Sequence, residues 1–236
     1  MDLLTIPIFI RLKPFPLVHN LSTHPSIASD ILIQMRDELL QLNPVLFRRN
    51  LFRFGQLMAY EISKHLRYET VEVTTQLGVA EGKKLIDPVV LGTILRAGLP
   101  MHEGMLSVFD NAENAFLSAF RHHHKDGTFE IRLDYISTPE LDDKVLIICD
   151  PMLATGSSMV RSLKALMEFG RPKEIHIATV IASSAGLEYV SIEYPDAFIW
   201  IGDEDEELTA RSFIVPGLGD AGDLAYGKKP EEEPME

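Results

Sequence analysis

Cysteine is nearly absent from this chain of 236 residues, which holds Cys149 alone. No disulfide can form within a single copy, so the small secreted domains that depend on disulfides are excluded, and a reducing, cytoplasmic location is expected. Cys149 ends the apolar run Val145 to Cys149. We therefore predict a small buried side chain at this position rather than a nucleophile.

Basic residues are also scarce, with 22 Lys and Arg against 35 Asp and Glu and a formal net charge of −13. Such a charge repels nucleic acid and anionic membrane surfaces, so neither is expected as a partner. Part of the charge lies in short acidic runs. We expect Asp203 to Glu207 to form a solvated loop, and the tail 228–236, rich in glutamate and proline, to be disordered.

Long apolar runs are missing as well, and no stretch approaches the length that spans a bilayer. The short run Leu3 to Ile10 follows Asp2 instead of basic residues and lacks a small-residue cleavage site, which argues against a signal peptide. Hydrophobic residues nevertheless make up 46% of the chain. That content suffices for one core, so we expect a single domain over residues 1–227.

The chain does contain a regular alternation of strand and helix patterns. Val89 to Leu95 is apolar throughout, as in a buried parallel strand, and Asn43-Pro44 is typical of a helix start. Further strands are predicted at 71–75, 115–120, 145–149, 174–182, 197–201 and 212–215, helices at 26–40, 44–66, 101–109, 159–169 and 184–192, and a projecting hairpin at 121–139. Repeating units of about 30 residues favour a parallel α/β sheet, whose ligands bind at the carboxyl ends of the strands.

The stretch from Val145 to Ser158 is the first candidate site. An apolar strand stops at Asp150, and the small residues Ala154 to Ser158 lead into a helix. Backbone N–H groups and the helix dipole at such a turn suit a phosphate-bearing ligand. No lysine follows Gly156, so this is not a Walker loop, and an ordinary strand-to-helix turn is the structural alternative.

A glycine-rich run near the end of the chain is the second candidate. Gly217 to Gly222 matches Gly-x-Gly-x-x-Gly, but only 14 residues follow Gly222, too few for a dinucleotide-binding unit. Exposed backbone groups in such a loop can match the donor and acceptor edge of a planar heterocycle. A simple loop that ends the domain is the alternative.

Two further groups of residues invite a binding role. Arg96 directly follows the strand Val89 to Leu95, where an arginine is either an anion ligand or a surface residue. His122, His123 and His124 suggest a metal at first sight. Adjacent residues of an extended chain point to alternate faces, so we favour a solvated polar turn over a metal site.

These motifs together resemble those of a known family. Asp150 to Gly156 is similar to the phosphoribosyl pyrophosphate loop of the type I phosphoribosyltransferases, and its Asp-Pro-Met start resembles the uracil phosphoribosyltransferases in particular. Ile94 to Leu99 and Pro216 to Asp223 match two more of that family's motifs, as does Pro16 to His19 near the start.

The chain departs from the family pattern at two of these places. Ser157 stands where the family usually has glycine, and Thr209 stands where asparagine is usual. If position 157 needs a positive φ, serine is strained there. If it is an ordinary helix N-terminal position, serine is favourable.

The resemblance implies a fold and an activity. The fold would be the type I phosphoribosyltransferase fold, an α/β structure with a central parallel sheet flanked by helices, N-terminal helices, a projecting β-hairpin and a C-terminal hood from about Pro195. The activity would be Mg²⁺-dependent transfer of the phosphoribosyl group of 5-phospho-α-D-ribose 1-diphosphate to uracil, giving UMP and pyrophosphate in pyrimidine salvage. The family's habit implies a homodimer or higher oligomer. A non-catalytic UMP- or RNA-binding regulator on the same fold and a phosphoribosyltransferase for another base are the alternatives.

The resemblance also assigns roles to single residues. Arg96, Asp150 and Asp220 would be catalytic, and Asp220 would lie near Mg²⁺ through water or substrate phosphates. The uracil pocket would be lined by Ile214, Gly219, Asp220 and Ala221. Phosphoribosyl pyrophosphate would be bound by Arg96, Arg121, Asp150, Pro151, Met152, Leu153, Ala154, Thr155, Gly156, Ser157, Ser158 and Asp220.

Overall fold

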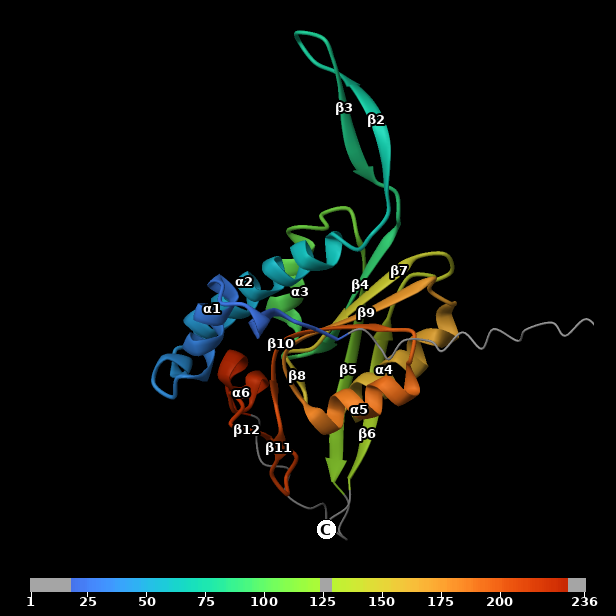
Figure 1. The fold of residues 1–236 in the computed structure, drawn as a ribbon. Helices are drawn as coiled ribbons and strands as arrows, with labels where there is room; N and C mark the ends of the chain where they lie inside the picture. Colours follow the sequence, from blue (N-terminus) through green and yellow to red (C-terminus); the bar gives the residue numbers. More distant parts are fainter. Residues whose placement is uncertain (1–17, 124–128, 229–236) are drawn as a thin grey trace, which may run out of the picture.

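The computed structural model describes residues 18–123 and 129–228, and these residues build an eight-stranded central sheet (Figure 1). Its neighbour order is β1-β10-β9-β7-β4-β5-β6, and β8 pairs with β9. The strands are β1 (Val18–Asn20), β4 (Val89–Leu95), β5 (Glu113–His123), β6 (Phe129–Ser137), β7 (Val145–Cys149), β8 (Met152–Leu153), β9 (Glu174–Ser183) and β10 (Phe198–Asp205). All pairs are parallel except β5 with β6, so most carboxyl ends meet at one edge.

Both faces of this sheet are buried, which explains why β7 is apolar throughout and β4 is apolar except at Thr93. Along β4, Leu91 joins a core on one face, whereas Val90 joins a core on the other. Ile147 and Ile148 of β7 divide between the same two cores. The period-two alternation therefore places each apolar side chain against one helical layer or the other.

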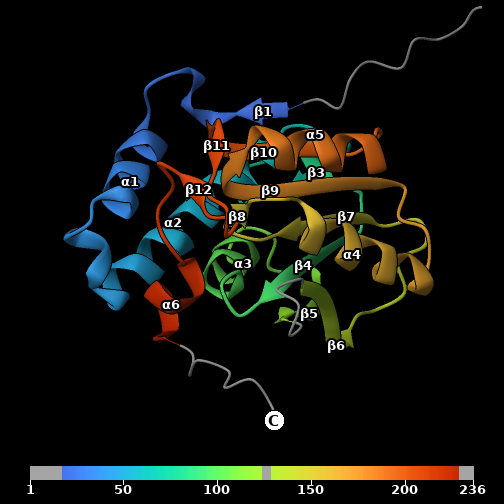
Figure 2. The same ribbon diagram turned by 90° about the horizontal axis from the view of Figure 1, so that it is seen from below.

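Helices cover the two faces unequally. On one face lie α1 (Ile27–Arg36), α2 (Pro44–Ser63), α3 (Leu99–Leu106) and the short α6 (Ala221–Tyr226); on the other lie α4 (Ser157–Leu166) and α5 (Ser184–Glu193). Figure 2 shows α6 beside α2, with α4 and α5 across the sheet. The predicted start of α2 is confirmed, because the Asn43 side chain accepts from the N–H groups of Val45 and Leu46.

The first helix ends earlier than its sequence pattern predicts, at Arg36 instead of Leu40. Asp37 adopts an extended backbone, and its carboxylate accepts from the N–H groups of Leu39 and Leu40 at 2.9 Å. These bonds give the chain an alternative to helical hydrogen bonding. A 3₁₀ turn over Leu40–Leu42 then leads into α2.

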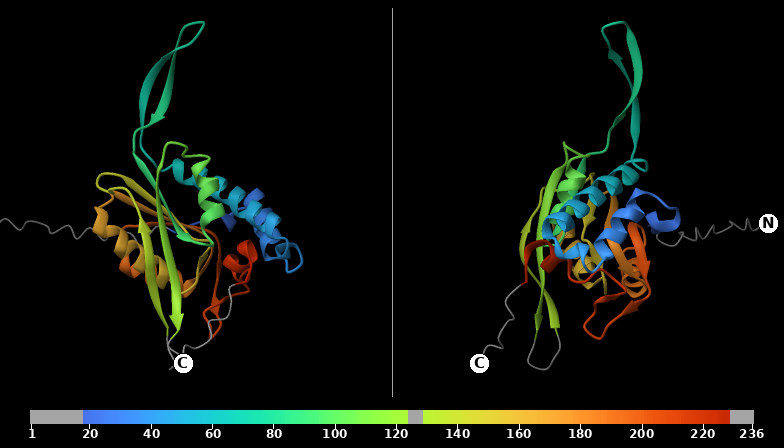
Figure 3. Two further views of the ribbon diagram at one scale, coloured as in Figure 1. Left: turned by 180° about the vertical axis from the view of Figure 1, so that it is seen from behind. Right: turned by 90° about the vertical axis from the view of Figure 1, so that its left-hand side faces the viewer.

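A second hairpin was only half predicted. β2 (Tyr68–Thr74) was expected, but its partner β3 (Val79–Leu85) contains Gly82 and two lysines and shows no alternation. The two antiparallel strands form an arm that projects from the sheet (Figures 1 and 3). The expected hairpin at 121–139 is also present as β5 and β6, with residues 124–128 outside the described part of the chain.

The base of the β2–β3 arm is fixed by a buried carboxylate. Arg67 donates from Nε and Nη2 to Asp87 Oδ1 at 3.0 and 2.7 Å, and Lys173 Nζ contacts the same oxygen. Burial alone would raise the pKa of Asp87, but the donors from Arg67 and Lys173 lower it to about 2. The Asp87 side chain is 1% exposed and that of Arg67 is 65% exposed, so a buried carboxylate is held here by a largely exposed guanidinium.

The acidic run 203–207 is not the solvated loop that its charge predicts. Asp203 to Asp205 continue β10, and Asp205 is buried. The expectation was wrong because Arg36 of α1 neutralises Asp205 with hydrogen bonds at 2.8 and 2.9 Å, a long-range contact that local charge patterning does not reveal. β10 (Phe198–Asp205) also belongs to the central sheet, so these residues are not part of the C-terminal hood expected from about Pro195.

Beyond β10 the chain forms a small two-stranded unit and then α6. β11 (Glu207–Leu208) pairs antiparallel with β12 (Ile214–Val215), and a cis peptide joins Val215 to Pro216. No helix in the described residues is long and apolar enough to cross a membrane. The tail expected to be disordered, apart from Lys228, lies outside the described residues.

Candidate active site

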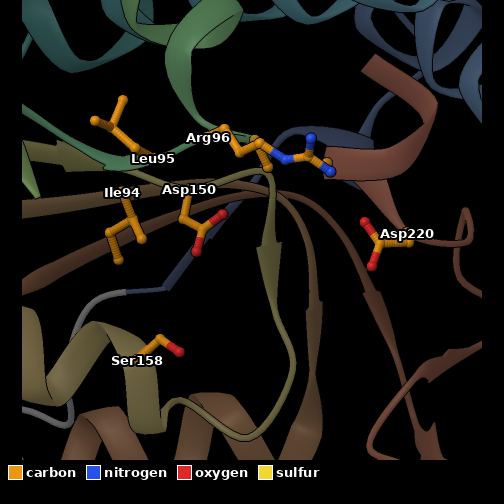
Figure 4. A pocket seen from close by; sticks show the side chains of 8 residues that line it. Ile94, Leu95, Arg96, Asp150, Ser158 and Asp220 are labelled. Atoms are coloured by element: carbon orange, nitrogen blue, oxygen red, sulfur yellow. The ribbon is translucent and has the colours of Figure 1, made fainter. Parts of the chain in front are cut away.

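Three chain segments meet at the carboxyl edge of the sheet and line one pocket (Figure 4). The first follows β4 and brings Arg96, the second follows β7 and brings Asp150 and Ser158, and the third precedes α6 and brings Asp220. In Figure 4 the carboxylates of Asp150 and Asp220 point into the same space from opposite sides. Residues more than 120 positions apart in the sequence thus share one cleft.

The turn before α4 leaves a helix N-terminus open toward this pocket. Gly156 precedes the helix with φ 74° and offers no side chain as a cap, and the Ser157 N–H makes only a long hydrogen bond of 3.4 Å to Thr155 Oγ1. Ser157 is the first helical residue and is not among the described non-glycine residues with positive φ. The second of the two alternatives for position 157 therefore holds, and serine fits without strain.

Two of the described α-helices, α3 and α4, differ from the others in how they begin. Side chains of Ser26, Asn43, Ser183 and Asp220 accept hydrogen bonds at the starts of α1, α2, α5 and α6. α3 and α4 have no such cap, and both begin with glycine at the carboxyl edge of the sheet. N–H groups left without a side-chain acceptor are the groups that bind an anion.

Asp150 is held in an unusual electrostatic state. It is half-buried, and desolvation raises its pKa to about 7, with a further contribution from the charge of Asp220 and despite a hydrogen bond from the Met152 backbone. No Lys or Arg of the described residues pairs with it. A carboxyl that is desolvated beside a like charge and lacks a counter-ion is typical of functional sites.

Arg96 faces the pocket but is also engaged by the C-terminal helix. It follows a cis peptide bond after Leu95, and its Nη2 donates to Asp223 Oδ1 at 2.8 Å and to the Gly227 carbonyl at 2.9 Å. Its Nε is buried without a hydrogen-bond partner among the described residues. The contacts with Asp223 and Gly227 therefore fix the guanidinium beside the pocket, with its hydrogen-bonding capacity only partly used.

The glycine-rich run folds as a loop that ends in a helix, which the sequence did not predict. Ile214 and Leu218 are buried on one side, whereas Gly219 and Asp220 are exposed. Asp220 caps α6 by accepting from the Asp223 N–H at 2.9 Å, which fixes its carboxylate toward the pocket. The loop so presents backbone groups and one carboxylate beside Arg96 and Asp150.

The chain is similar in sequence to proteins of one family. The family model described as uracil phosphoribosyltransferase matches residues 21–228. The protein named uracil phosphoribosyltransferase from Porphyromonas gingivalis is 51% identical over 213 residues, which cover 90% of this chain and 99% of that protein. The chain belongs to the uracil phosphoribosyltransferase family.

Proteins of lower sequence identity also match most of the chain. A uracil phosphoribosyltransferase from Methanothermobacter thermautotrophicus is 43% identical over 189 residues, covering 79% of this chain and 86% of that protein. The solved structure of the AQ2163 protein from Aquifex aeolicus aligns with a TM-score of 0.81 at 32% identity, covering 89% of this chain and 98% of that one. The fold expected from the resemblance, an α/β phosphoribosyltransferase sheet flanked by helices, is confirmed.

Four of the site residues expected from the resemblance line the described pocket. Arg96, Asp150, Ser158 and Asp220 line the pocket, and Ala221 follows at the start of α6. Arg121 lies in β5 opposite Ile131, and its side chain is outside the described part.

The second departure from the family pattern is accommodated locally. The Thr209 hydroxyl accepts from the Phe213 N–H at 3.1 Å, and the Thr209 N–H donates to the Phe213 carbonyl at 2.8 Å. Threonine thus closes the turn between β11 and β12 with its own side chain.

Two residues of this region escaped sequence reasoning. Asp223 belongs to the glycine-rich run, and the sequence assigned it no role, yet its carboxylate pairs with Arg96. Arg48 of α2 donates to the Ala225 carbonyl at 2.6 Å and lies over the Tyr226 ring, 5.9 Å from its centroid. A charged side chain inside a glycine-rich motif was the available signal for Asp223, whereas nothing local singled out Arg48.

The donor set suits Mg²⁺ that arrives with a substrate. Asp150 and Asp220 offer hard carboxylate oxygens on one pocket, and their mutual repulsion would be relieved by a divalent cation. No cluster of three or more His, Cys, Asp or Glu that could hold a metal occurs in the described residues. Substrate phosphates and water would therefore complete the coordination.

Proposed function

We propose that this member of the uracil phosphoribosyltransferase family transfers the phosphoribosyl group of 5-phospho-α-D-ribose 1-diphosphate to uracil, giving UMP and pyrophosphate. The observation that carries the proposal is the convergence of Arg96, Asp150, Ser158 and Asp220 on one pocket beside a glycine-rich loop. Displacement at the anomeric carbon builds positive charge on the sugar, so the protein needs no nucleophile. It must hold both reactants in line and stabilise the leaving pyrophosphate.

The phosphoribosyl half of the site is assigned to the segments after β4 and β7. Ala154 to Ser158 would bind the 5′-phosphate through the uncapped N-terminus of α4. Asp150 would accept from the ribose hydroxyls, with Pro151, Met152 and Leu153 holding the loop in place. Arg96 and Arg121 would bind the pyrophosphate, because guanidinium groups keep their charge and donate in pairs.

The base half is assigned to the loop before α6. Backbone groups of Ile214, Gly219 and Ala221 would match the donor and acceptor edge of uracil, and Asp220 would reach both halves. Bound Mg²⁺, held by Asp220 through water or by substrate phosphates, would neutralise charge on the pyrophosphate. The protein itself orients the base and excludes water from the anomeric carbon.

The assembly proposed for this family member is a homodimer or higher oligomer. The projecting β2–β3 arm supports it, because Val73, Leu77 and Val79 are 49%, 100% and 68% exposed on a segment far from the core. Apolar side chains on an extended arm favour burial against a second copy. Light scattering on the wild type and on Leu77→Asp tests this assignment, since a monomeric wild type would contradict it.

The activity is tested by incubating the protein with labelled uracil, 5-phospho-α-D-ribose 1-diphosphate and Mg²⁺ and measuring UMP. Competition by cytosine, orotate and hypoxanthine tests the choice of base. Absence of UMP at any practical enzyme concentration would reject the proposal. Binding of UMP or pyrimidine-gene leader RNA without turnover would instead favour the regulatory alternative.

A further inference from the structure

Two side chains from distant segments bind the backbone N–H and the backbone carbonyl of Gly217, in the loop before α6. Its N–H donates to Asp205 Oδ2 at 3.0 Å, and its carbonyl accepts from Arg36 Nη1 at 2.9 Å. The same Arg36 Nη1 donates to Asp205 Oδ2 at 2.8 Å, and Nη2 donates to Oδ1 at 2.9 Å. We call these three residues the Arg36–Asp205–Gly217 clamp.

The clamp fixes a residue that has little freedom to move. Gly217 is buried with φ 62°, and a Cβ at this position would lie 2.1 Å from the Ile214 carbonyl oxygen. The residues assigned to the base flank it in the chain, with Ile214 before Gly217 and Gly219 to Ala221 after it. A shift of Gly217 would therefore displace every backbone group that the base half uses.

The charged side chains of the clamp are largely shielded from water. The Asp205 side chain is 5% exposed and that of Arg36 is 20% exposed, so Asp205 depends on Arg36 and Gly217 rather than on water, whereas Arg36 has the more exposed Asp203 as a second partner. Removing one partner from such a pair leaves the other charge uncompensated. The bidentate guanidinium also fixes direction, which a lysine would not do.

We infer that Arg36 and Asp205 are positioning residues that orient the loop for the nucleobase, an inference that rests on the proposed function. Neither residue lines the phosphoribosyl pocket. Their loss should therefore weaken the use of uracil much more than the use of 5-phospho-α-D-ribose 1-diphosphate.

The chain supplies a matched control for this inference. Asp203 lies two residues earlier on β10 and also contacts Arg36, at 3.3 Å, but no hydrogen bond joins it to the described loop residues 214–222, and its side chain is 35% exposed. Asp203→Asn and Asp205→Asn remove the same charge from the same strand. Only the second removes the charge that faces Gly217.

The experiment measures KM for each substrate, kcat and backbone hydrogen exchange of residues 214–222 in both variants, in Arg36→Lys and in the wild type. Asp205→Asn should raise KM for uracil about ten-fold or more and speed exchange of the loop, with KM for the second substrate within about two-fold. Arg36→Lys should show the same pattern with a smaller rise, and Asp203→Asn should match the wild type.

The outcomes separate the clamp from the activity. A wild-type protein that makes no UMP would overturn the proposed function and this inference with it. An active wild type whose Asp205→Asn and Arg36→Lys variants keep both KM values would overturn the inference alone. A lowered unfolding midpoint with both KM values changed equally would assign the clamp to stability only, which also overturns it.

Discussion

Two carboxyl groups at opposite ends of the parallel strands of this sheet have opposite electrostatic states. Asp87 precedes β4 at the amino end and is surrounded by donors from Arg67 and Lys173, so its pKa is lowered to about 2. Asp150 follows β7 at the carboxyl end, where desolvation and the nearby Asp220 raise its pKa to about 7. The fold neutralises one acid with its own cations and leaves the other to be neutralised by something that binds.

This difference separates a structural acid from a functional one. A paired carboxylate adds to stability, whereas a desolvated one without a counter-ion subtracts from it and is retained only for another reason. The comparison therefore predicts opposite effects for the same chemical change at the two positions.

The largest effect is expected on the activity of Asp150→Asn. Loss of the carboxylate that would hold the ribose hydroxyls should lower kcat/KM roughly 10²–10³-fold, the range found when one preorganised polar group is removed. UMP formation measures this. Activity within about three-fold of the wild type would show that Asp150 is not part of the catalytic site.

The same variant should be more stable than the wild type in the absence of substrate. Above neutral pH the wild type keeps a desolvated charge that asparagine lacks. A pKa raised from 3.8 to about 7 sets an upper bound of roughly 4 kcal/mol on the resulting rise in the free energy of unfolding. Urea unfolding at pH 8 measures the change. A lower free energy of unfolding for Asp150→Asn would contradict the claim that the desolvated Asp150 carboxylate lowers stability.

Asp87→Asn should do the reverse. It leaves the cations of the arm base without their carboxylate and should lower the free energy of unfolding by about 2 kcal/mol, less than for a fully buried pair because Arg67 is 65% exposed. Turnover below the unfolding temperature should stay within about two-fold of the wild type, because the site lies at the other end of the strands. A large loss of turnover without loss of stability would contradict the structural role.

The pH dependence of stability should carry both signatures. The folded pKa of Asp87 is lowered from 3.8, so its contribution is present above about pH 4 and is lost as pH falls toward 2. The folded pKa of Asp150 is raised, so the wild type should lose stability relative to Asp150→Asn as pH rises from about 4 to about 7. Parallel curves for the wild type and Asp150→Asn would show that Asp150 titrates normally.

The smallest effect is expected from Ser157→Gly, which changes the site and leaves both carboxyls alone. Since Ser157 is an ordinary helical residue, glycine should cost about 0.5–1 kcal/mol of stability through backbone entropy. Activity should change less than about two-fold. An activity gain of ten-fold would mean that serine obstructs the phosphate loop.

Features set by nearby residues could be predicted from the sequence, and features set by distant partners could not. The Asn43 cap, the apolar β4 and the turn after Asp150 depend on neighbours in the chain, and they lie where they were expected. β3 has no alternating pattern, since both faces of the arm are exposed.

The same limit applies to the site. Family motifs brought Arg96, Asp150 and Asp220 into one hypothesis, and the structure brings these residues to one pocket. Burial of Asp205 depends on an arginine 169 positions away, and the pairing of Arg96 with Asp223 spans 127 positions. Neither contact leaves a pattern in the neighbouring sequence, so charge runs and glycine patterns alone cannot predict it.

The lone thiol has a practical consequence. Cys149 lies between two helical layers with no exposed surface, and burial raises its pKa to about 12. A maleimide should therefore react with the folded protein only when the middle of the sheet opens. Labelling of this single position gives a native reporter of global unfolding, which needs no engineered probe.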